Sequence, residues 1–133
     1  MLFRSLPVGA STAFQAEVAG VVPLAVIDHP SIVALDASDP SQPQPVTLPV
    51  TISGRIEAPR DIDAFAFAAK KGQKLRVRIE SNALGFLLDP LLLITDAAGK
   101  LLAEVDDTNN QRDAQLDFTP PTDGDYRDRK SVV

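Results

Sequence analysis

A strict alternation of apolar and charged residues over positions 75–80 constrains the fold of this chain more than any other feature of its sequence. Leu75, Val77 and Ile79 are each followed by a charged residue. Successive side chains of a β-strand point to opposite faces of its sheet. The pattern therefore predicts a strand with one face in a hydrophobic core and the other in solvent.

The same period of two recurs in other short segments. It runs through residues 46–56, 62–68 and 114–118, and further strands are expected at 91–94, buried on both faces, and at 101–105. Residues 70–73, 96–99 and 120–124 carry the Gly, Pro and Asp typical of turns. Short strands separated by turns, without helical stretches between them, predict an all-β fold, an antiparallel β-sandwich.

The N-terminal third lacks this regular pattern. We interpret residues 6–30 as the tail of a preceding region, with short strands at 18–22 and 24–27 or, alternatively, a helix at 11–19. Residues 31–45 are rich in proline and are expected to form an extended linker that makes few ladder hydrogen bonds. The β-sandwich would then occupy residues 46–127.

Both ends of the chain look foreign to a protein. Residues 1–5 and 128–133 back-translate to DNA that resembles the two adapters of short-read sequencing. We therefore expect both segments to be adapter-like artefacts that lie outside the fold. On this interpretation the sandwich is truncated before its last strand, and the true termini and any signal peptide are missing.

Composition excludes several classes of function. The chain has 133 residues, of which 44% are hydrophobic, enough for one domain with a core. A net charge of −5 argues against nucleic acid and anionic membranes as partners, and 5% aromatic residues without Trp argue against a stacking platform. There is no Cys, and the single His29 makes a Ser-His-Asp triad or a multi-His zinc site unlikely to form. No apolar run reaches the roughly 18 residues of a membrane helix.

A series of motifs resembles a known family. In order they are LPVTISGRI at 48–56, DIDAFAF at 61–67, AKKGQ at 69–73, LDP at 88–90, EVDD at 104–107 and FTPPTDGDY at 118–126. Their order and spacing resemble the bacterial pre-peptidase C-terminal domain, in the versions found in large proteins of planctomycete-like bacteria. The resemblance implies a jelly-roll-type β-sandwich. It also implies a closing strand of the form Y-x-V-x-V, whose place after Tyr126 is taken by the adapter-like tail.

The resemblance also implies a role. We expect a non-catalytic accessory module of a larger exported bacterial protein, secreted or in the cell envelope, that acts as a spacer or an adhesion domain. Its partners would be neighbouring domains of the same polypeptide and an extracellular protein or polysaccharide. One alternative is a calcium-dependent binding module for matrix protein or polysaccharide. Another is a fragment of a secreted hydrolase such as a peptidase.

Four carboxylates are candidates for a calcium site. Calcium takes about six to eight oxygen ligands, which neighbouring loops can supply. Relatives of the resembled family that bind collagen build such a site from the linker and the start of the following strand. At the matching positions this chain has Asp36, Asp39, Asp61 and Asp63. The alternative is that Asp61 and Asp63 cap a turn and solvate a strand end.

Other polar groups are better explained structurally. The acidic segment 106–110 with Asp113 lacks the spacing of an EF-hand and is typical of a solvated loop. His29 is expected at the surface. A basic turn formed by Lys70, Lys71 and Lys74 could take a phosphate or a polyanion, although the net charge opposes it. The hydrophobic core is expected to contain Phe65, Phe67, Phe86 and Phe118.

Overall fold

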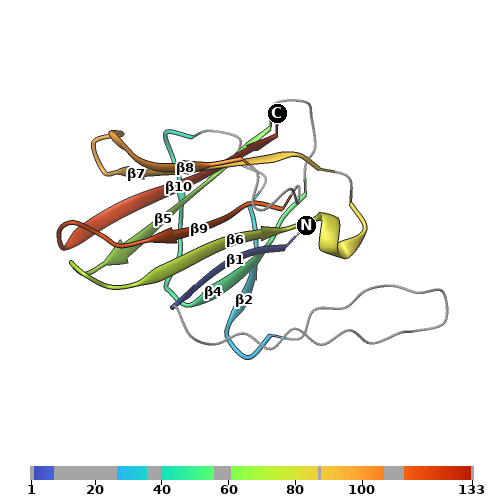
Figure 1. Ribbon diagram of the computed structural model, residues 1–133, viewed down its shortest axis with the longest axis horizontal. Helices are drawn as coiled ribbons and strands as arrows, with labels where there is room; N and C mark the ends of the chain where they lie inside the picture. The colour runs from blue at the N-terminus through green and yellow to red at the C-terminus, as the bar shows by residue number, and fades with distance from the viewer. Residues whose placement is uncertain are drawn as a thin grey trace.

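The fold is a β-sandwich made of two five-stranded sheets. The computed structural model describes residues 2–7, 27–35, 40–55, 61–86, 88–106 and 113–132. Figure 1 shows the strands in two layers, with β5, β7, β8 and β10 in one and β1, β2, β4, β6 and β9 in the other. The all-β prediction is therefore confirmed.

The first sheet has the order β2-β4-β1-β6-β9. Its strands are β1 (Leu2–Pro7), β2 (Ser31–Val33), β4 (Val50–Ser53), β6 (Leu75–Glu80) and β9 (Gln115–Phe118). Strand β1 pairs antiparallel with both β4 and β6. At one edge, β2 pairs parallel with β4.

The second sheet has the order β3-β5-β10-β7-β8. Its strands are β3 (Gln44–Pro45), β5 (Ile62–Ala69), β7 (Pro90–Asp96), β8 (Leu101–Val105) and β10 (Gly124–Val132). The central strand β10 pairs antiparallel with β5 and with β7. At the edge, β3 pairs parallel with β5.

The core lies between the two sheets and follows the predicted alternation. Leu75, Val77 and Ile79 are at most 1% exposed, which confirms the inward face of β6. Phe65 and Phe67 are 3% and 4% exposed, and both belong to the same core cluster. On the facing sheet, Val50, Ile52 and Phe118 complete it. Burying one such side chain contributes about 1.5–3 kcal/mol relative to leaving it in water.

Tyr126 connects the core to the turn before β10. Its ring stacks on Phe67 at a centroid distance of 6.0 Å and meets Phe118 edge-on at 5.4 Å. Its hydroxyl donates a hydrogen bond of 2.6 Å to the carbonyl oxygen of Thr122. One residue thus joins strands of both sheets and fixes the turn that leads into β10.

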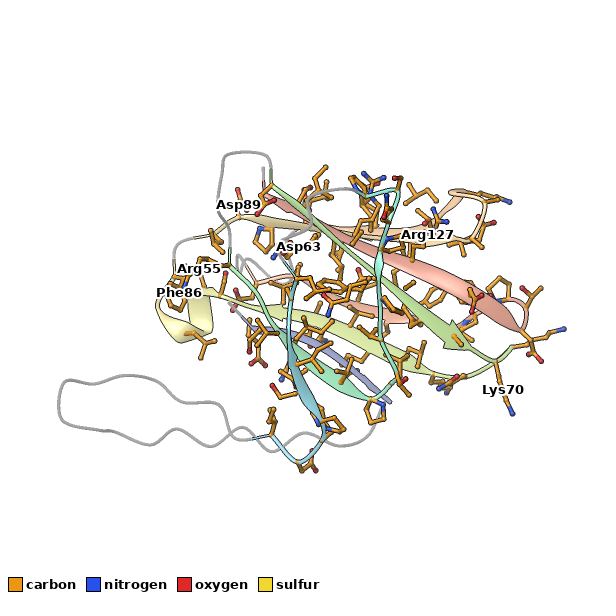
Figure 2. All side chains as sticks on the ribbon, turned by 180° about the vertical axis from the view of Figure 1, so that it is seen from behind. Arg55, Asp63, Lys70, Phe86, Asp89 and Arg127 are labelled. Atoms are coloured by element: carbon orange, nitrogen blue, oxygen red, sulfur yellow. The ribbon has the colours of Figure 1, made fainter. Side chains whose placement is uncertain are left out.

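The prediction for Phe86 is wrong. Its side chain is 53% exposed, and Figure 2 shows it at the end of the sandwich beside the short helix. The residue follows the 3₁₀ helix η1 (Asn82–Leu84) and Gly85, which adopts a φ of 86°. The N–H of Phe86 donates to the carbonyl of Ser81, so the residue belongs to a turn and not to a strand with an inward face.

The single strand expected over residues 46–56 is shorter in the structure. Only Val50–Ser53 form β4, whereas Gln44–Pro45 belong to β3 in the other sheet. Residues between them, including Val46 and Leu48, cross from one sheet to the other and pack against the core. The alternating apolar residues of 46–56 therefore belong in part to strand β4 and in part to the segment that crosses between the sheets, and both parts pack against the core.

The apolar run at 91–94 forms part of β7, but only one face is fully buried. Leu92 and Ile94 are 0% exposed, whereas Leu91 and Leu93 are half-buried. The turn expected at 96–99 is present: the Asp96 carboxylate accepts hydrogen bonds from the N–H groups of Ala98 and Lys100. The hairpin between β7 and β8 is thereby confirmed.

Residues expected to lie outside the sandwich take part in its sheets. The proline-rich segment contributes β2 and β3, and residues 2–5 pair with β4 and β6. Strand β10 runs to Val132, so residues 128–132, which were expected to lie outside the fold, pair with β7. The hydrogen bonds between strands join backbone groups, so a segment can pair with two neighbouring strands even where its side chains lack the alternation typical of a strand. The segments predicted at 11–19 and 18–22, and all but one residue of 24–27, lie outside the described residues.

Candidate functional site

Asp63, one of the four predicted calcium ligands, forms a buried ion pair. Its Oδ2 lies 2.5 Å from the ammonium nitrogen of Lys130, with the two side chains 10% and 1% exposed. The residues face each other across β5 and β10. The charge of the Asp63 carboxylate is therefore balanced by a cation that belongs to the chain itself.

Gly54, which follows β4, lies beside the same ion pair. A Cβ on Gly54 would lie 3.3 Å from Ala34 Cβ and 3.5 Å from Asp63 Oδ2, so only a residue without a side chain fits there easily. Ala34 precedes Asp36 by two positions in the sequence.

The remaining predicted ligands are placed only in part. Asp61 is half-buried immediately before β5, whereas Asp36 and Asp39 lie outside the described residues. Within the described parts of the chain, no group of three or more His, Cys, Asp or Glu could hold a metal ion. Calcium binding through these four residues therefore stays a prediction.

A second buried carboxylate, Asp128 on β10, lies near this pair. Its charge is not compensated by an ion pair of the kind that Lys130 forms with Asp63. It is 2% exposed, and its Oδ1 is buried without a hydrogen-bond partner. Burial raises the pKa of Asp128 well above its usual range, and the charge of Lys130 opposes this only in part. Asp128 and Lys130 share the inward face of β10 with Tyr126, where the alternation calls for apolar residues. Sequence reasoning missed both because it placed residues 128–133 outside the fold.

The prediction that His29 lies at the surface is wrong, because its side chain is only 6% exposed. Its Nε2 lies 2.6 Å from Thr51 Oγ1 and its Nδ1 lies 3.0 Å from Asp28 Oδ1. The order carboxylate, imidazole, hydroxyl is that of a nucleophile with its base. However, Thr51 is 0% exposed, so no substrate reaches its hydroxyl. The contacts fasten residues 28–30 to β4, where Thr51 N–H also donates to the Pro30 carbonyl.

Asp113, from the acidic loop, accepts hydrogen bonds that hold the start of the helix η1 in place. Its Oδ1 accepts hydrogen bonds from Ser81 N–H at 2.9 Å, Ser81 Oγ at 3.1 Å and Asn82 N–H at 2.7 Å. These donors lie at the start of η1, where backbone N–H groups otherwise lack partners. Residues 107–110 of the loop lie outside the described residues.

On the outer face of the first sheet, charged residues form ion pairs. Arg76 on β6 makes two hydrogen bonds to Asp117 on β9, at 2.7 and 3.0 Å. These bonds lower the pKa of Asp117 and raise the pKa of Arg76. Arg78 pairs with Glu80 further along β6. The charged residues of β6 thus point away from the core, as the alternation predicts, but they are only partly exposed.

A concave surface of about 610 Å³ lies at one end of the sandwich, next to the basic turn. Its lining consists of residues 68–73 together with Gly124 and Asp125. Figure 2 shows Lys70 at this end, and Asp63 and Asp89 toward the other end. Here a concave surface and a group of exposed charged residues coincide.

The fold and these sites define an all-β domain whose buried polar groups hold its own segments together. None of the described helices is long and apolar enough to cross a membrane. No family model matches the chain. The chain is similar to a probable subtilase-type serine protease of Deinococcus radiodurans, with 42% identity over 69 residues. That stretch is 51% of this chain and 9% of the protease, so the chain spans a small part of the relative's length.

Proposed function

We propose that this domain is a non-catalytic accessory module of a larger exported bacterial protein, of the pre-peptidase C-terminal type. The observation that carries the proposal is the buried Thr51 hydroxyl, which with His29 forms the nucleophile-like arrangement of the described chain and which no substrate can reach. The similarity to a short stretch of a subtilase-type protease supports a place beside a peptidase domain. The module would act as a spacer or interaction domain.

The proposal is tested by assaying the purified chain for hydrolysis of labelled casein and for labelling by a fluorophosphonate that reacts with activated hydroxyls. We expect neither reaction. Hydrolysis or labelling that disappears in both Thr51→Val and His29→Gln would overturn the proposal and favour the hydrolase fragment. Ser53→Ala, which removes a hydroxyl from the same strand, is the matched control.

A calcium-dependent binding module is the second proposal. The position of Gly54 favours it, because a Cβ there would lie 3.3 Å from Ala34, two residues before Asp36 in the sequence, and 3.5 Å from the Asp63 carboxylate. For calcium to bind there, the ammonium of Lys130 must leave Asp63. Asp36, Asp39 and Asp61 would then complete an oxygen-rich site.

This second proposal predicts a calcium-dependent rise in the melting temperature that is larger in Lys130→Met than in the unaltered chain. A ligand that binds only the folded state raises its stability. Lys100→Met, at an exposed hairpin position, is the control. If calcium at about 5 mM, well above typical extracellular affinities, shifts neither protein, the calcium proposal fails.

A further inference from the structure

The turn between β5 and β6 has a defined conformation. We call residues 70–74 the lysine turn. Lys71 N–H donates to Asp123 Oδ1 at 2.7 Å, and Gly72 N–H donates to the Pro120 carbonyl at 3.0 Å. Within the turn, Gln73 N–H donates to the Lys70 carbonyl, and Gln73 Oε1 accepts from Lys70 N–H. The turn is therefore anchored to the connection between β9 and β10, and its shape exists before any ligand arrives.

The lysine turn also presents unpaired charge. Lys70, Lys71 and Lys74 are exposed, and within the described residues none of their ammonium groups has an ion-pair or hydrogen-bond partner. By contrast, Arg76 and Lys130 are paired. Three such cations, with the carboxylates of Asp123 and Asp125 beside them, leave this part of the described surface net positive in a chain of net charge −5, which attracts anionic groups.

The lining of the adjoining concave surface indicates what kind of anion fits. Ala68, Gly72 and Gly124 have small or no side chains, so a ligand backbone can approach closely. The lining contains no aromatic ring on which a sugar would stack. The exposed Asp125 carboxylate can accept hydrogen bonds from amide N–H groups. Carboxylates for the lysines and amide donors for Asp125 occur together in an acidic peptide.

We propose that the lysine turn and its concave surface bind an extended acidic peptide segment. The inference rests on the proposed function as an interaction module and names the chemistry of its partner. Acidic side chains lie against the three ammonium groups, while the peptide backbone crosses Ala68 and Gly124. The volume of about 610 Å³ falls within the range of small-ligand sites, roughly 300–1,000 Å³.

The test uses a fluorescein-labelled octapeptide of alternating Glu and Gly and measures its anisotropy with the full chain at low ionic strength. We expect saturable binding that weakens about tenfold in Lys70→Gln/Lys71→Gln, as loss of two exposed charge contacts implies. Binding should disappear at about 0.5 M salt, because exposed charges are screened. Lys100→Gln, which removes an exposed lysine from the β7–β8 hairpin, should bind like the unaltered chain. Circular dichroism and melting temperature show that each variant is folded.

Three results overturn the inference. The first is that no saturable binding occurs, and the second is that Lys100→Gln weakens binding as much as the double variant does. The third is that polygalacturonate binds the turn while the acidic peptide does not, which would assign the site to a polysaccharide. Each result leaves the accessory-module proposal standing, because that proposal depends on the separate hydrolysis and labelling assays.

Discussion

Lys130 of β10 lies directly opposite Asp63 of β5, with its ammonium nitrogen 2.5 Å from the Asp63 carboxylate. The pair joins two neighbouring strands of the second sheet beside Gly54, where a Cβ would lie 3.5 Å from Asp63 Oδ2 and 3.9 Å from Lys130 Nζ. Both charges are nearly inaccessible to water, so each depends on the other for compensation.

The first prediction concerns this pair. Lys130→Met leaves the Asp63 carboxylate buried without its partner and should lower the free energy of unfolding by about 3–5 kcal/mol. Asp63→Leu combined with Lys130→Met should recover most of that loss, because an apolar pair of similar volume needs no charge compensation. Urea unfolding of the three proteins measures both effects. A single variant as stable as the unaltered chain would mean that the two residues are not paired.

The second prediction concerns pH. The pKa of Asp128 is raised in the folded state, so folding favours its protonated form. The contribution of Asp128 to the free energy of unfolding should therefore be fully present below the unfolded pKa of about 3.9 and should be lost as the pH rises through the folded pKa. Asp128→Asn, which resembles the protonated acid, should remove this decline and be more stable than the unaltered chain at neutral pH. Unfolding measured from acid to neutral pH tests this, and parallel curves for the two proteins would contradict it.

The third prediction separates buried from exposed aromatic residues. Phe67→Ala should cost about 3–5 kcal/mol, because it leaves a cavity beneath Tyr126. Phe86→Ala should change stability by less than about 0.5 kcal/mol, since half of its ring already lies in water. Thermal melts decide the matter. Equal effects at the two positions would show that the assignment of inner and outer faces is wrong.

The fourth prediction concerns the hydrogen bonds that Asp113 accepts at the start of η1. Asp113→Ala removes the acceptor of three hydrogen bonds and should cost about 1–3 kcal/mol, the price of leaving such donors unpaired. Asp117→Ala is the matched control, because its ion pair with Arg76 is exposed and worth at most about 1 kcal/mol. Chemical unfolding of both variants gives the comparison. A larger loss of unfolding free energy for Asp117→Ala than for Asp113→Ala would contradict this role of Asp113.

The sequence predicted the parts of the fold that follow from a local pattern, such as alternation or turn residues. Alternation identified β6 and the core positions of Phe65 and Phe67, and Asp96 with Gly99 identified the β7–β8 hairpin. Strands β2 and β3 were missed because they contain three and two residues and have no period to detect. Their position comes from parallel pairing with strands far along the chain.

The polar contacts could not be predicted for a different reason. His29 and Thr51 are 22 residues apart and Lys130 and Asp63 are 67 apart, so only the assembled sheets bring them together. Alternation also assigns charged residues to the solvent face. Asp128 and Lys130 break that rule at inward positions. Their segment was placed outside the fold for another reason, its resemblance to a translated adapter.

The most direct test of the structure is amide hydrogen exchange across β10 in the full chain. If β10 pairs with both of its neighbours through Val132, the amides of residues 126–131 that bond to β5 and β7 should be protected to a similar degree as those of Phe65. Protection that ends after Arg127, with residues 128–132 exchanging as fast as a free peptide, would contradict the central position of β10 in the second sheet.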